Sequence, residues 1–388
     1  MRFTSLVWKN LIRRPARSAL TLTALATAIA AVVALVGISQ GFTRSFAGVY
    51  EAHHVDVVVS RQGTSDRLSS SVDASYLPSI EALEKVALAD GVLFETLSFE
   101  EEGVYGIPTM GIRPDSWLLQ DYQVVDQKDI ASAAGDVNVV APGELGEPRT
   151  LMLGVNLADR LGKRAGERVN LFDEPYLISE VFRSSSNWEN GSMILPLATL
   201  QQLTDRDGQF TYINVVLAKP LSAAEVAAAI KAIQALDGKL SPLATKQFVE
   251  TDTRMQLAGA MAWMTSIIAL LIGSIATLNT MLTSVLERTR EIGILRAIGW
   301  TKRRVISMIL LESCGLALAA SVLGSTLAYL ITWALSRAPI VNGMLSPSID
   351  GPVLIQGLVL GLGIGLLGAA LPAWRAAQLQ PTEAFREF

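Results

Sequence analysis

Cysteine and histidine are nearly absent from this chain of 388 residues, which contains one cysteine, Cys314, and two histidines, His53 and His54. A single cysteine excludes a disulfide within the chain, and Cys314 is expected to be a small packing residue in an apolar run. Adjacent histidines point to different sides of a helix or a strand, and no acidic or cysteine cluster at ligand spacing accompanies them. We therefore expect no metal or haem site and no bound cofactor.

Sequence motifs of catalysis are missing as well. The chain has no H-E-x-x-H motif, which removes one common signature of hydrolases. It also lacks the loop G-x-x-x-x-G-K-[ST], whose backbone amides cradle the phosphates of ATP. We expect a chain that is not an enzyme, in which any ATP hydrolysis is supplied by a partner subunit.

Charge is scarce, and this places the chain in a membrane. Charged residues make up 18% of the sequence, 50% of the residues are hydrophobic, and the mean hydropathy is +0.38. A helix that crosses a hydrocarbon core needs about 20 consecutive apolar residues. Four segments qualify, at 18–41, 257–286, 305–334 and 353–372. The sequence predicts an α-helical membrane protein with four transmembrane helices.

The first apolar segment has a basic lead, so it could instead be a cleaved signal peptide. Its apolar stretch from Ala19 to Ile38 is longer than the usual h-region of about 7–15 residues, and no clear small-x-small cleavage site follows it. We favour an uncleaved span.

Lysine and arginine near span ends tend to stay in the cytoplasm, and their distribution here predicts the topology. Segment 1–17 holds five basic residues, segment 287–304 holds six and the tail 373–388 holds two, whereas loop 335–352 holds one, Arg337. We therefore expect a multi-pass protein of the cell membrane, inner or plasma, with both termini and segment 287–304 in the cytoplasm.

The polar segment 42–256 then lies outside the cytoplasm. Residues 42–254 contain 18 basic and 30 acidic side chains, a net charge of −12, which argues against a nucleic-acid partner.

Segments 55–59 and 213–217 read as buried strands, and 222–236 as a helix capped by Ser222 and Glu225. This mixture predicts an extracytoplasmic α/β or α+β domain inserted between the first two spans. Segments 40–52 and 245–257 contain no proline, and we expect them to extend these spans outward as a helical stalk.

Two features of the spans suggest close packing and function. Gly357, Gly361 and Gly365 recur every four residues and share one helix face, which allows another helix to approach, either in a dimer or within the chain's own bundle. Glu312 is an acid inside the third span. It has either a functional role, as intramembrane acids usually do, or a place at the cytoplasmic interface.

Segment 287–304 carries a charge pattern on an amphipathic helix. Opposite charges lie three residues apart in the pairs Glu287/Arg290 and Arg288/Glu291. The apolar residues Ile292, Leu295 and Ile298 recur on one face, and we expect Gly299 to end the helix and Thr301 to cap the next one. The segment is either a topology signal or a docking element for a soluble partner.

Several segments together resemble one family. The stretch NTMLTSVLERTREIGILRAIGWTKRRVISMILLES (279–313) looks like the signature of FtsX-like, MacB-type ABC transporter permeases. The tail PAWRAAQLQPTEAFRE (372–387), the N-terminal LVWKNLIRRPARSALTLTALATAIA and the middle stretches LGVNLADRLGKRAGERVNLF and SMILPLATLQQL are similar to the family too. The resemblance covers both ends and parts of the middle, in the order the family has them.

The resemblance implies a homodimer, or a dimer with a related permease, bound to two copies of a cytoplasmic ABC ATPase. The positions that match the family's coupling helix, and would contact the ATPase, are Arg290, Glu291, Gly293, Arg296 and Gly299. In this mechanotransmission family, motion driven by nucleotide passes through the spans and stalk to the outer domain. Its members include macrolide exporters, DevC-like exporters, lipoprotein-releasing complexes and regulators of cell-wall hydrolases.

Two functions from different classes follow. The first is a permease that uses ATP-driven motion to export or extract a substrate on the outer side, and the second is a transmembrane regulator that activates an extracytoplasmic partner such as a cell-wall hydrolase. An outer domain of about 210 residues fits the exporter and lipoprotein-release branches better than the regulators with small domains. Membrane lipid is an obligatory neighbour, whereas the substrate, and any extracytoplasmic adaptor or substrate protein, stay open.

Overall fold

The computed structural model describes residues 15–63, 67–125, 149–219, 222–336 and 348–379. The chain divides into two compact units. The helical unit comprises Met1–Gln40, Ala258–Leu335 and Pro347–Phe388, and the α/β domain comprises Gly41–Leu257 and Ser336–Ser346. Most of the basic lead 1–17, Arg337 and Arg386, on which the predicted topology partly rests, lie outside the described residues.

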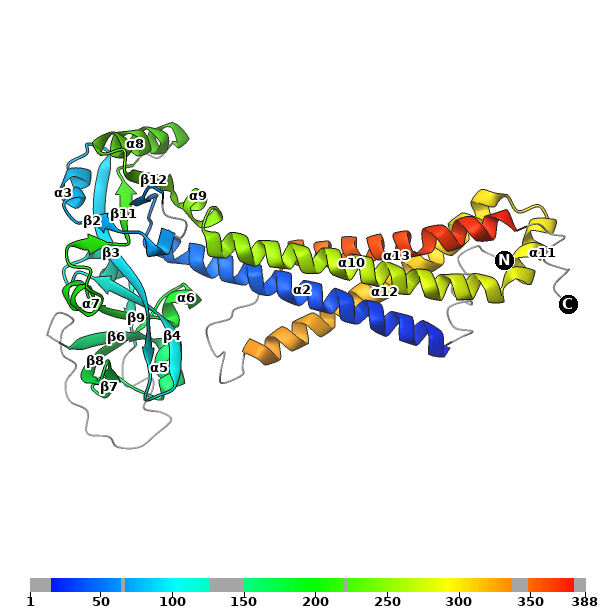
Figure 1. The fold of residues 1–388 in the computed structure, drawn as a ribbon, viewed down its shortest axis with the longest axis horizontal. Helices are drawn as coiled ribbons and strands as arrows, with labels where there is room; N and C mark the ends of the chain where they lie inside the picture. The colour runs from blue at the N-terminus through cyan, green and yellow to red at the C-terminus, as the bar shows by residue number, and fades with distance from the viewer. Residues whose placement is uncertain (1–14, 64–66, 126–148, 220–221, 337–347, 380–388) are drawn as a thin grey trace. The chain divides into compact units, whose positions relative to one another are not determined.

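The helical unit is built on four long helices, drawn in Figure 1 as α2 (Pro15–Ala52), α10 (Thr253–Glu287), α12 (Lys302–Ser336) and α13 (Gly351–Gln378). Each is long and apolar enough to cross a membrane. A short helix, α11 (Thr289–Ala297), joins α10 to α12. The four helices confirm the fold class predicted from the apolar runs, a helical membrane protein with an α/β domain between its first two spans.

The last helix contains Pro372, the residue at which we expect the last span to end. Helix α13 continues through Pro372 to Gln378. Proline removes one backbone hydrogen bond and tends to kink a helix, but buried packing can hold the segment in place. Ala369, Ala373 and Ala376, on both sides of the proline, are fully buried in a cluster with residues of α12.

Small residues let the helices of this unit approach closely. A Cβ atom on Gly357 would lie 2.6 Å from Val33 Cγ2, and one on Gly365 would lie 2.9 Å from Ala317 Cβ. The structure therefore places these glycines, together with Gly361 beside Ser321, against α2 and α12 of the same chain. A close approach to backbone occurs at a glycine that the sequence did not single out, Gly324, whose Cβ would lie 2.6 Å from the Ala26 carbonyl oxygen.

The α/β domain is organised around a mixed sheet. Its strands are β1 (Val57–Arg61), β3 (Val86–Phe99), β4 (Val104–Ile112), β5 (Gln123–Val124), β6 (Thr150–Gly154), β7 (Arg168–Leu171), β8 (Glu174–Arg183), β9 (Met193–Pro196), β11 (Tyr212–Leu217) and β12 (Leu240–Ala244). Their order is β12-β1-β11-β3-β4-β9-β6-β8-β5, with β7 paired to β8. The pairs β4–β9 and β6–β8 are parallel, whereas the others are antiparallel. A separate pair joins β2 (Val72–Asp73) to β10 (Gln209–Phe210).

Both faces of this sheet are covered. Neighbouring residues of a strand point to opposite faces, so Val57 and Val59 enter one apolar core and Val58 enters the other. The first core is covered by short helices: α3 (Tyr76–Glu81), α5 (Val155–Leu161), α7 (Leu197–Leu203) and α8 (Ala223–Leu236). The second receives Phe46 and Tyr50 from the end of α2 and Phe248 from α9 (Thr245–Glu250). The second core also includes residues of the 3-10 helix η2 (Trp117–Asp121).

Three predicted elements of this domain, two strands and one helix, are confirmed. Strands β1 and β11 lie where the apolar runs predicted them, within two residues. Ser222 caps α8 in a capping box, in which its hydroxyl accepts a hydrogen bond from the Glu225 amide at 3.3 Å and the Glu225 carboxylate accepts one from the Ser222 amide at 2.8 Å.

The expected stalk is correct on one side and wrong on the other. Helix α2 continues without a break to Ala52, as predicted for 40–52. Segment 245–257 is not one helix, because α9 ends at Glu250 and α10 begins at Thr253. The side chain of Asp252 accepts a hydrogen bond from the Arg254 amide at 2.9 Å, so it caps a new helix start.

Candidate functional site

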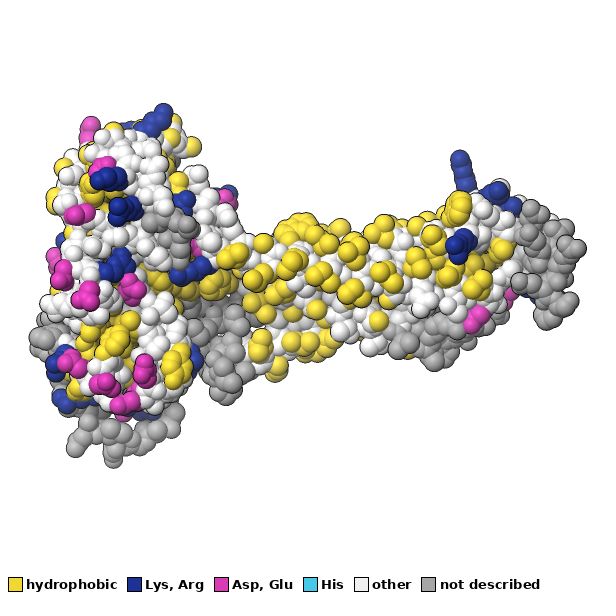
Figure 2. Space-filling view, in the orientation of Figure 1, with side chains coloured by type: hydrophobic (Ala, Val, Ile, Leu, Met, Phe, Trp, Pro, Cys, Tyr) yellow, Lys and Arg dark blue, Asp and Glu magenta, His cyan; other side chains and the backbone are white. Residues whose placement is uncertain are grey.

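The charged segment 287–304 folds around α11. Only Arg288 separates the last residue of α10 from the first residue of α11. Helix α11 ends as predicted, because Gly299 has a φ of +99°, which disfavours residues with a side chain. The Thr301 hydroxyl then accepts a hydrogen bond from the Arg304 amide at 3.4 Å, at the start of α12. In Figure 2 lysine and arginine side chains gather near this end of the helical unit, whereas apolar side chains cover most of the visible helix surface.

One face of α11 is exposed and mixed in character. We call it the docking face, and it consists of Arg290, Glu291, Ile294, Ala297 and Ile298. Ile294 and Ile298 are 40% and 73% exposed, and they share this face with the charged residues Arg290 and Glu291. Of the predicted apolar face, Ile292 is buried and Leu295 is partly buried in one apolar cluster with α12, whereas Ile298 is exposed. A helix surface of this kind suits a protein partner that offers both apolar and charged groups.

Two of the five residues expected to contact an ATPase face inward. Gly293 is buried. Arg296 is half-buried, and its Nη1 donates to the Trp300 carbonyl oxygen at 3.1 Å across the α11–α12 turn. Arg290, Glu291 and Gly299 are exposed. Arg296 therefore stabilises the turn between α11 and α12. We expect direct contact with a partner from the three exposed residues.

Glu312, the acid predicted inside the third span, is buried in α12. Its carboxylate accepts hydrogen bonds from Nη1 of Arg288, at 3.2 Å for Oε2 and 3.4 Å for Oε1. The structure thus connects this acid to the charged segment, a relation that the separation of 24 residues hides in the sequence.

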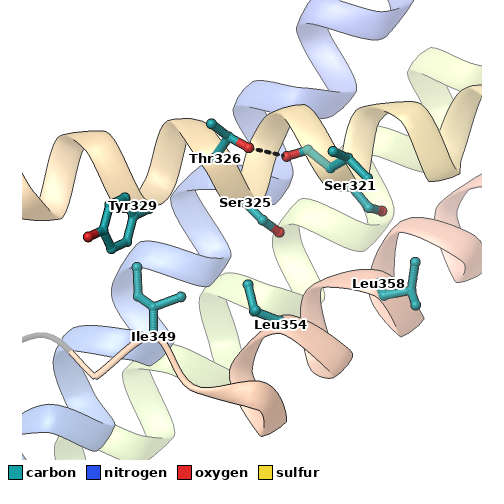
Figure 3. A pocket seen from close by; sticks show the side chains of 8 residues that line it. Ser321, Ser325, Thr326, Tyr329, Ile349, Leu354 and Leu358 are labelled. Atoms are coloured by element: carbon teal, nitrogen blue, oxygen red, sulfur yellow. Dashed lines mark hydrogen bonds between the residues drawn. The ribbon is translucent and has the colours of Figure 1, made fainter.

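An apolar groove with a volume of about 480 Å³ lies between α12 and α13. In Figure 3 Ser325 and Tyr329 on α12 face Ile349 and Leu354 on the opposite wall. Its lining residues are Ser321, Val322, Ser325, Thr326, Tyr329, Ile349, Leu354 and Leu358. The Thr326 hydroxyl is used within its own helix, where it donates to the Val322 carbonyl oxygen at 2.9 Å. The groove offers mainly apolar contact, and nothing in the hydropathy pattern distinguished these residues from other span residues.

The α/β domain contains a buried polar cluster around His53, directly after α2. His53 Nδ1 lies 2.9 Å from Asp121 Oδ2, and its Nε2 lies 3.1 Å from Glu189 Oε1. The Tyr122 hydroxyl donates to the same Glu189 oxygen at 2.7 Å. His54 is exposed, so the two histidines point to different sides as predicted. Among the described residues, no group of three or more histidine, cysteine, aspartate or glutamate side chains could hold a metal ion.

The two carboxylates favour the charged form of His53. Burial lowers the pKa of His53, but its hydrogen bonds and charge interactions with Glu189 and Asp121 outweigh burial and raise the pKa above its ordinary value of 6.5. An imidazolium donates from both ring nitrogens, which matches a carboxylate at each of them. His53 thereby holds the end of α2 to η2 and to the short helix α6 (Asn187–Asn190) that carries Glu189.

This cluster predicts a pH-dependent stability of the α/β domain. Because the pKa of His53 is higher in the folded state, its contribution is fully present below pH 6.5 and is lost as the pH rises through the raised folded value. We expect the free energy of unfolding to fall across this pH range. Thermal unfolding of the purified chain, followed by tryptophan fluorescence across this pH range, measures it, since Trp117 packs edge-on against the His53 ring.

The adjacent histidine provides a matched control. His53→Asn should flatten the alkaline decrease, whereas His54→Asn should leave it unchanged, because His54 is exposed and asparagine tolerates its φ of +52°. The same pH profile in both variants would show that other groups cause the decrease.

Two family models match this chain. The MacB-like periplasmic core domain matches residues 18–233, and the FtsX-like permease C-terminal domain matches residues 263–381. The second match contains α11 and its docking face, and the first contains the His53 cluster. Together the two models span most of the chain in the order that the sequence motifs indicated.

Similar proteins include ABC transporter components. The chain is 24% identical over 392 residues to a macrolide export ATP-binding/permease protein MacB of Nitrobacter winogradskyi, covering 95% of this chain and 58% of that protein. It is 38% identical over 121 residues to the uncharacterized ABC transporter permease YknZ of Bacillus subtilis, covering 31% of this chain and 29% of that protein. The chain thus spans little more than half the length of the MacB relative.

Among solved structures, the chain is similar to the periplasmic region of MacB from Actinobacillus actinomycetemcomitans. The TM-score is 0.36 at 10% identity, and the match covers 52% of this chain and 94% of that one. Family membership rests on the sequence models, of which the periplasmic core domain alone matches more than half of the residues. The chain is a multi-pass membrane protein that belongs to the family of FtsX-like, MacB-type ABC transporter permeases.

Proposed function

We propose that this chain is the permease component of an ABC transporter, which receives ATP-driven motion at α11 and uses it to export or extract a substrate on the side of the α/β domain. The observation that supports it best is the docking face, where two exposed isoleucines follow two exposed charged residues along a helix between two spans. Exposed apolar groups rimmed by charge are typical of a protein interface.

The ATP-binding component is expected to dock on this face. The MacB relative is named an ATP-binding/permease protein, and this sequence contains no phosphate-binding loop of its own. Two permeases, identical or related, would bind two copies of the ATP-binding component, with α11 on the cytoplasmic side and the α/β domain outside. The exposed side chains of Arg290 and Glu291 would make directional contacts, and Ile298 would provide the apolar anchor.

The other end of the proposed path is the packing of α2 on the α/β domain. Phe46 packs edge-on against Trp188 with ring centroids 5.7 Å apart, and Tyr50 packs against Phe248 at 5.6 Å. The Ser186 hydroxyl donates to the Ser45 carbonyl oxygen at 2.7 Å. These contacts fix the last turns of α2 to the sheet, so a shift of α2 would move the domain with it.

The groove between α12 and α13 indicates a class of substrate. The groove between α12 and α13 is mainly apolar and carries the exposed hydroxyl-bearing side chain of Tyr329, which suits an apolar or amphiphilic molecule, membrane lipid included. The alternative function, activation of an external partner such as a cell-wall hydrolase, would use the same motion. Purification of the intact membrane complex distinguishes the two by what is bound to the α/β domain.

Loosening α2 next to the domain tests this path. Replacing both Thr43 and Arg44 with glycine should weaken the helix by roughly 1 kcal/mol per residue. We expect ATP hydrolysis by the assembled transporter to persist, while the nucleotide-dependent response of a fluorophore at Tyr105→Cys, in a Cys314→Ser background, falls severalfold. Tyr105 is exposed in the α/β domain, so it can be labelled.

The same pair replaced with alanine is the control, because alanine retains the helix and also removes both side chains. An alanine pair that responds like the parent chain assigns the loss to helix stiffness. An undiminished response in the glycine pair would show that α2 does not carry the motion, and the proposed transmission would be wrong.

A further inference from the structure

One guanidinium group bridges two carboxylates at the corner between α10 and α11. Arg288 Nε lies 3.3 Å from Glu291 Oε2 on α11, and Nη1 lies 3.2 Å from Glu312 Oε2 on α12. The side chains of Arg288 and Glu312 are 17% and 9% exposed, whereas Glu291 is 56% exposed. The contact with Glu312 is therefore the buried half of the bridge.

Glu312 is buried in a stretch of α12 that is otherwise rich in buried apolar residues. Met308 and Ile309 of this stretch belong to an apolar cluster with Val285 of α10 and Ile292 of α11. A carboxylate in such surroundings is costly without a charged partner, and removing one member of a buried pair leaves the other uncompensated. The ion pair of Arg288 and Glu312 is therefore expected to hold α11 and α12 in one arrangement.

The covalent connection between α11 and α12 is a short turn, residues 298–301. It passes through Gly299, a residue with positive φ, and it holds only the C-terminal end of α11. Arg288 is the N-cap residue at the opposite end of α11. The ion pair therefore ties the N-terminal end of α11 to α12 as well, so that α11 is attached to α12 at both of its ends.

We propose that Glu312, acting through Arg288, is a positioning residue that fixes α11 to α12, so that a movement of α11 reaches α12 as well as α10. The role of this movement in transport rests on the proposed function, whereas the attachment of α11 to α12 does not. Arginine is required here because its planar group offers separate N–H donors to two carboxylates, which a lysine ammonium on a flexible stem matches poorly.

Hydrogen exchange on the full-length chain in lipid nanodiscs, without an ATP-binding component, tests the attachment. Single variants Glu312→Gln and Arg288→Gln should each accelerate amide exchange in α11 by about tenfold to a hundredfold, while exchange in α13 stays unchanged. The double variant should exchange no faster than the faster single variant, because it leaves no unpaired buried charge. Glu291→Gln, which removes the exposed half of the bridge, should have a smaller effect.

Three results would overturn the proposal: unchanged exchange in α11, acceleration that is equal in α11 and α13, or two effects that simply add in the double variant. Unchanged exchange would mean that the ion pair does not attach α11 to α12. Equal acceleration in both helices would mean that Glu312 only contributes to general stability, and additive effects would mean that Arg288 and Glu312 act independently. None of these results depends on ATPase docking. The proposed function is tested separately, and it fails if the ATP-binding component does not bind α11.

Discussion

The variant Gly324→Val should strongly destabilise the native helix bundle. A Cβ at this position lies 2.6 Å from the Ala26 carbonyl oxygen and 3.2 Å from the Ala30 amide nitrogen, which are backbone atoms of α2 and cannot rotate away as a side chain can. Helix α12 must then move off α2, which also separates the apolar residues Ile29 and Ala320 of that core. We expect a destabilisation of about 3 kcal/mol or more, measured as a lower temperature at which the solubilised chain loses monodispersity.

Gly363→Val is the matched control on α13. The nearest atom to its Cβ would be Leu270 Cδ1 at 3.4 Å, the movable end of a side chain, so this variant should melt close to the parent chain. Equal melting of both variants would mean that α12 and α2 do not pack at Gly324 in the membrane protein.

The second large effect is expected on the docking face. A chain with Arg290→Lys, Ile294→Ser and Ile298→Ser keeps every positive charge of the segment, so its insertion and orientation should be normal. It loses the planar guanidinium and both apolar contacts, and we expect the affinity for the ATP-binding component to fall about a hundredfold or more. Co-purification from membranes and stimulated ATP hydrolysis, at equal membrane level, measure this loss.

A control with the same kinds of replacement on α12, Arg303→Lys with Leu311→Ser, should keep both activities, because these exposed residues lie outside the docking face. Retention of the ATP-binding component by both variants would support the topology-signal interpretation of segment 287–304. The ATP-binding component would then have to bind another part of the chain.

Local signals allowed much of the fold to be predicted from the sequence. Apolar runs identified the four long helices because the bilayer sets their length, and the capping box of Ser222 and Glu225 was readable because its partners lie three residues apart. Gly299 was recognised for the same reason, as a local end of α11. The break between α9 and α10 was not predicted, because the absence of proline in 245–257 favoured a continuous helix.

The functional residues were only partly predictable. Helical periodicity grouped Ile292 with Ile298, but only the packing of α12 shows that the first is buried and the second open. Similarly, the bridge from Arg288 to Glu312 and the cluster of His53 with Asp121 and Glu189 join residues that are distant in sequence. The unusual acid within a span was the one readable signal, and it indicated Glu312 but not its partner.

Site-specific cross-linking at Ile298 tests the central claim most directly. A photoreactive amino acid at this exposed position, in the assembled transporter in native membranes, should form an adduct with the ATP-binding component. The same amino acid at Val322, which is 66% exposed but lies well within the span α12, should not. Adducts with lipid or with a second permease, and none with an ATP-binding component that is nevertheless present in the purified complex, would contradict the claim that α11 receives the motion driven by ATP.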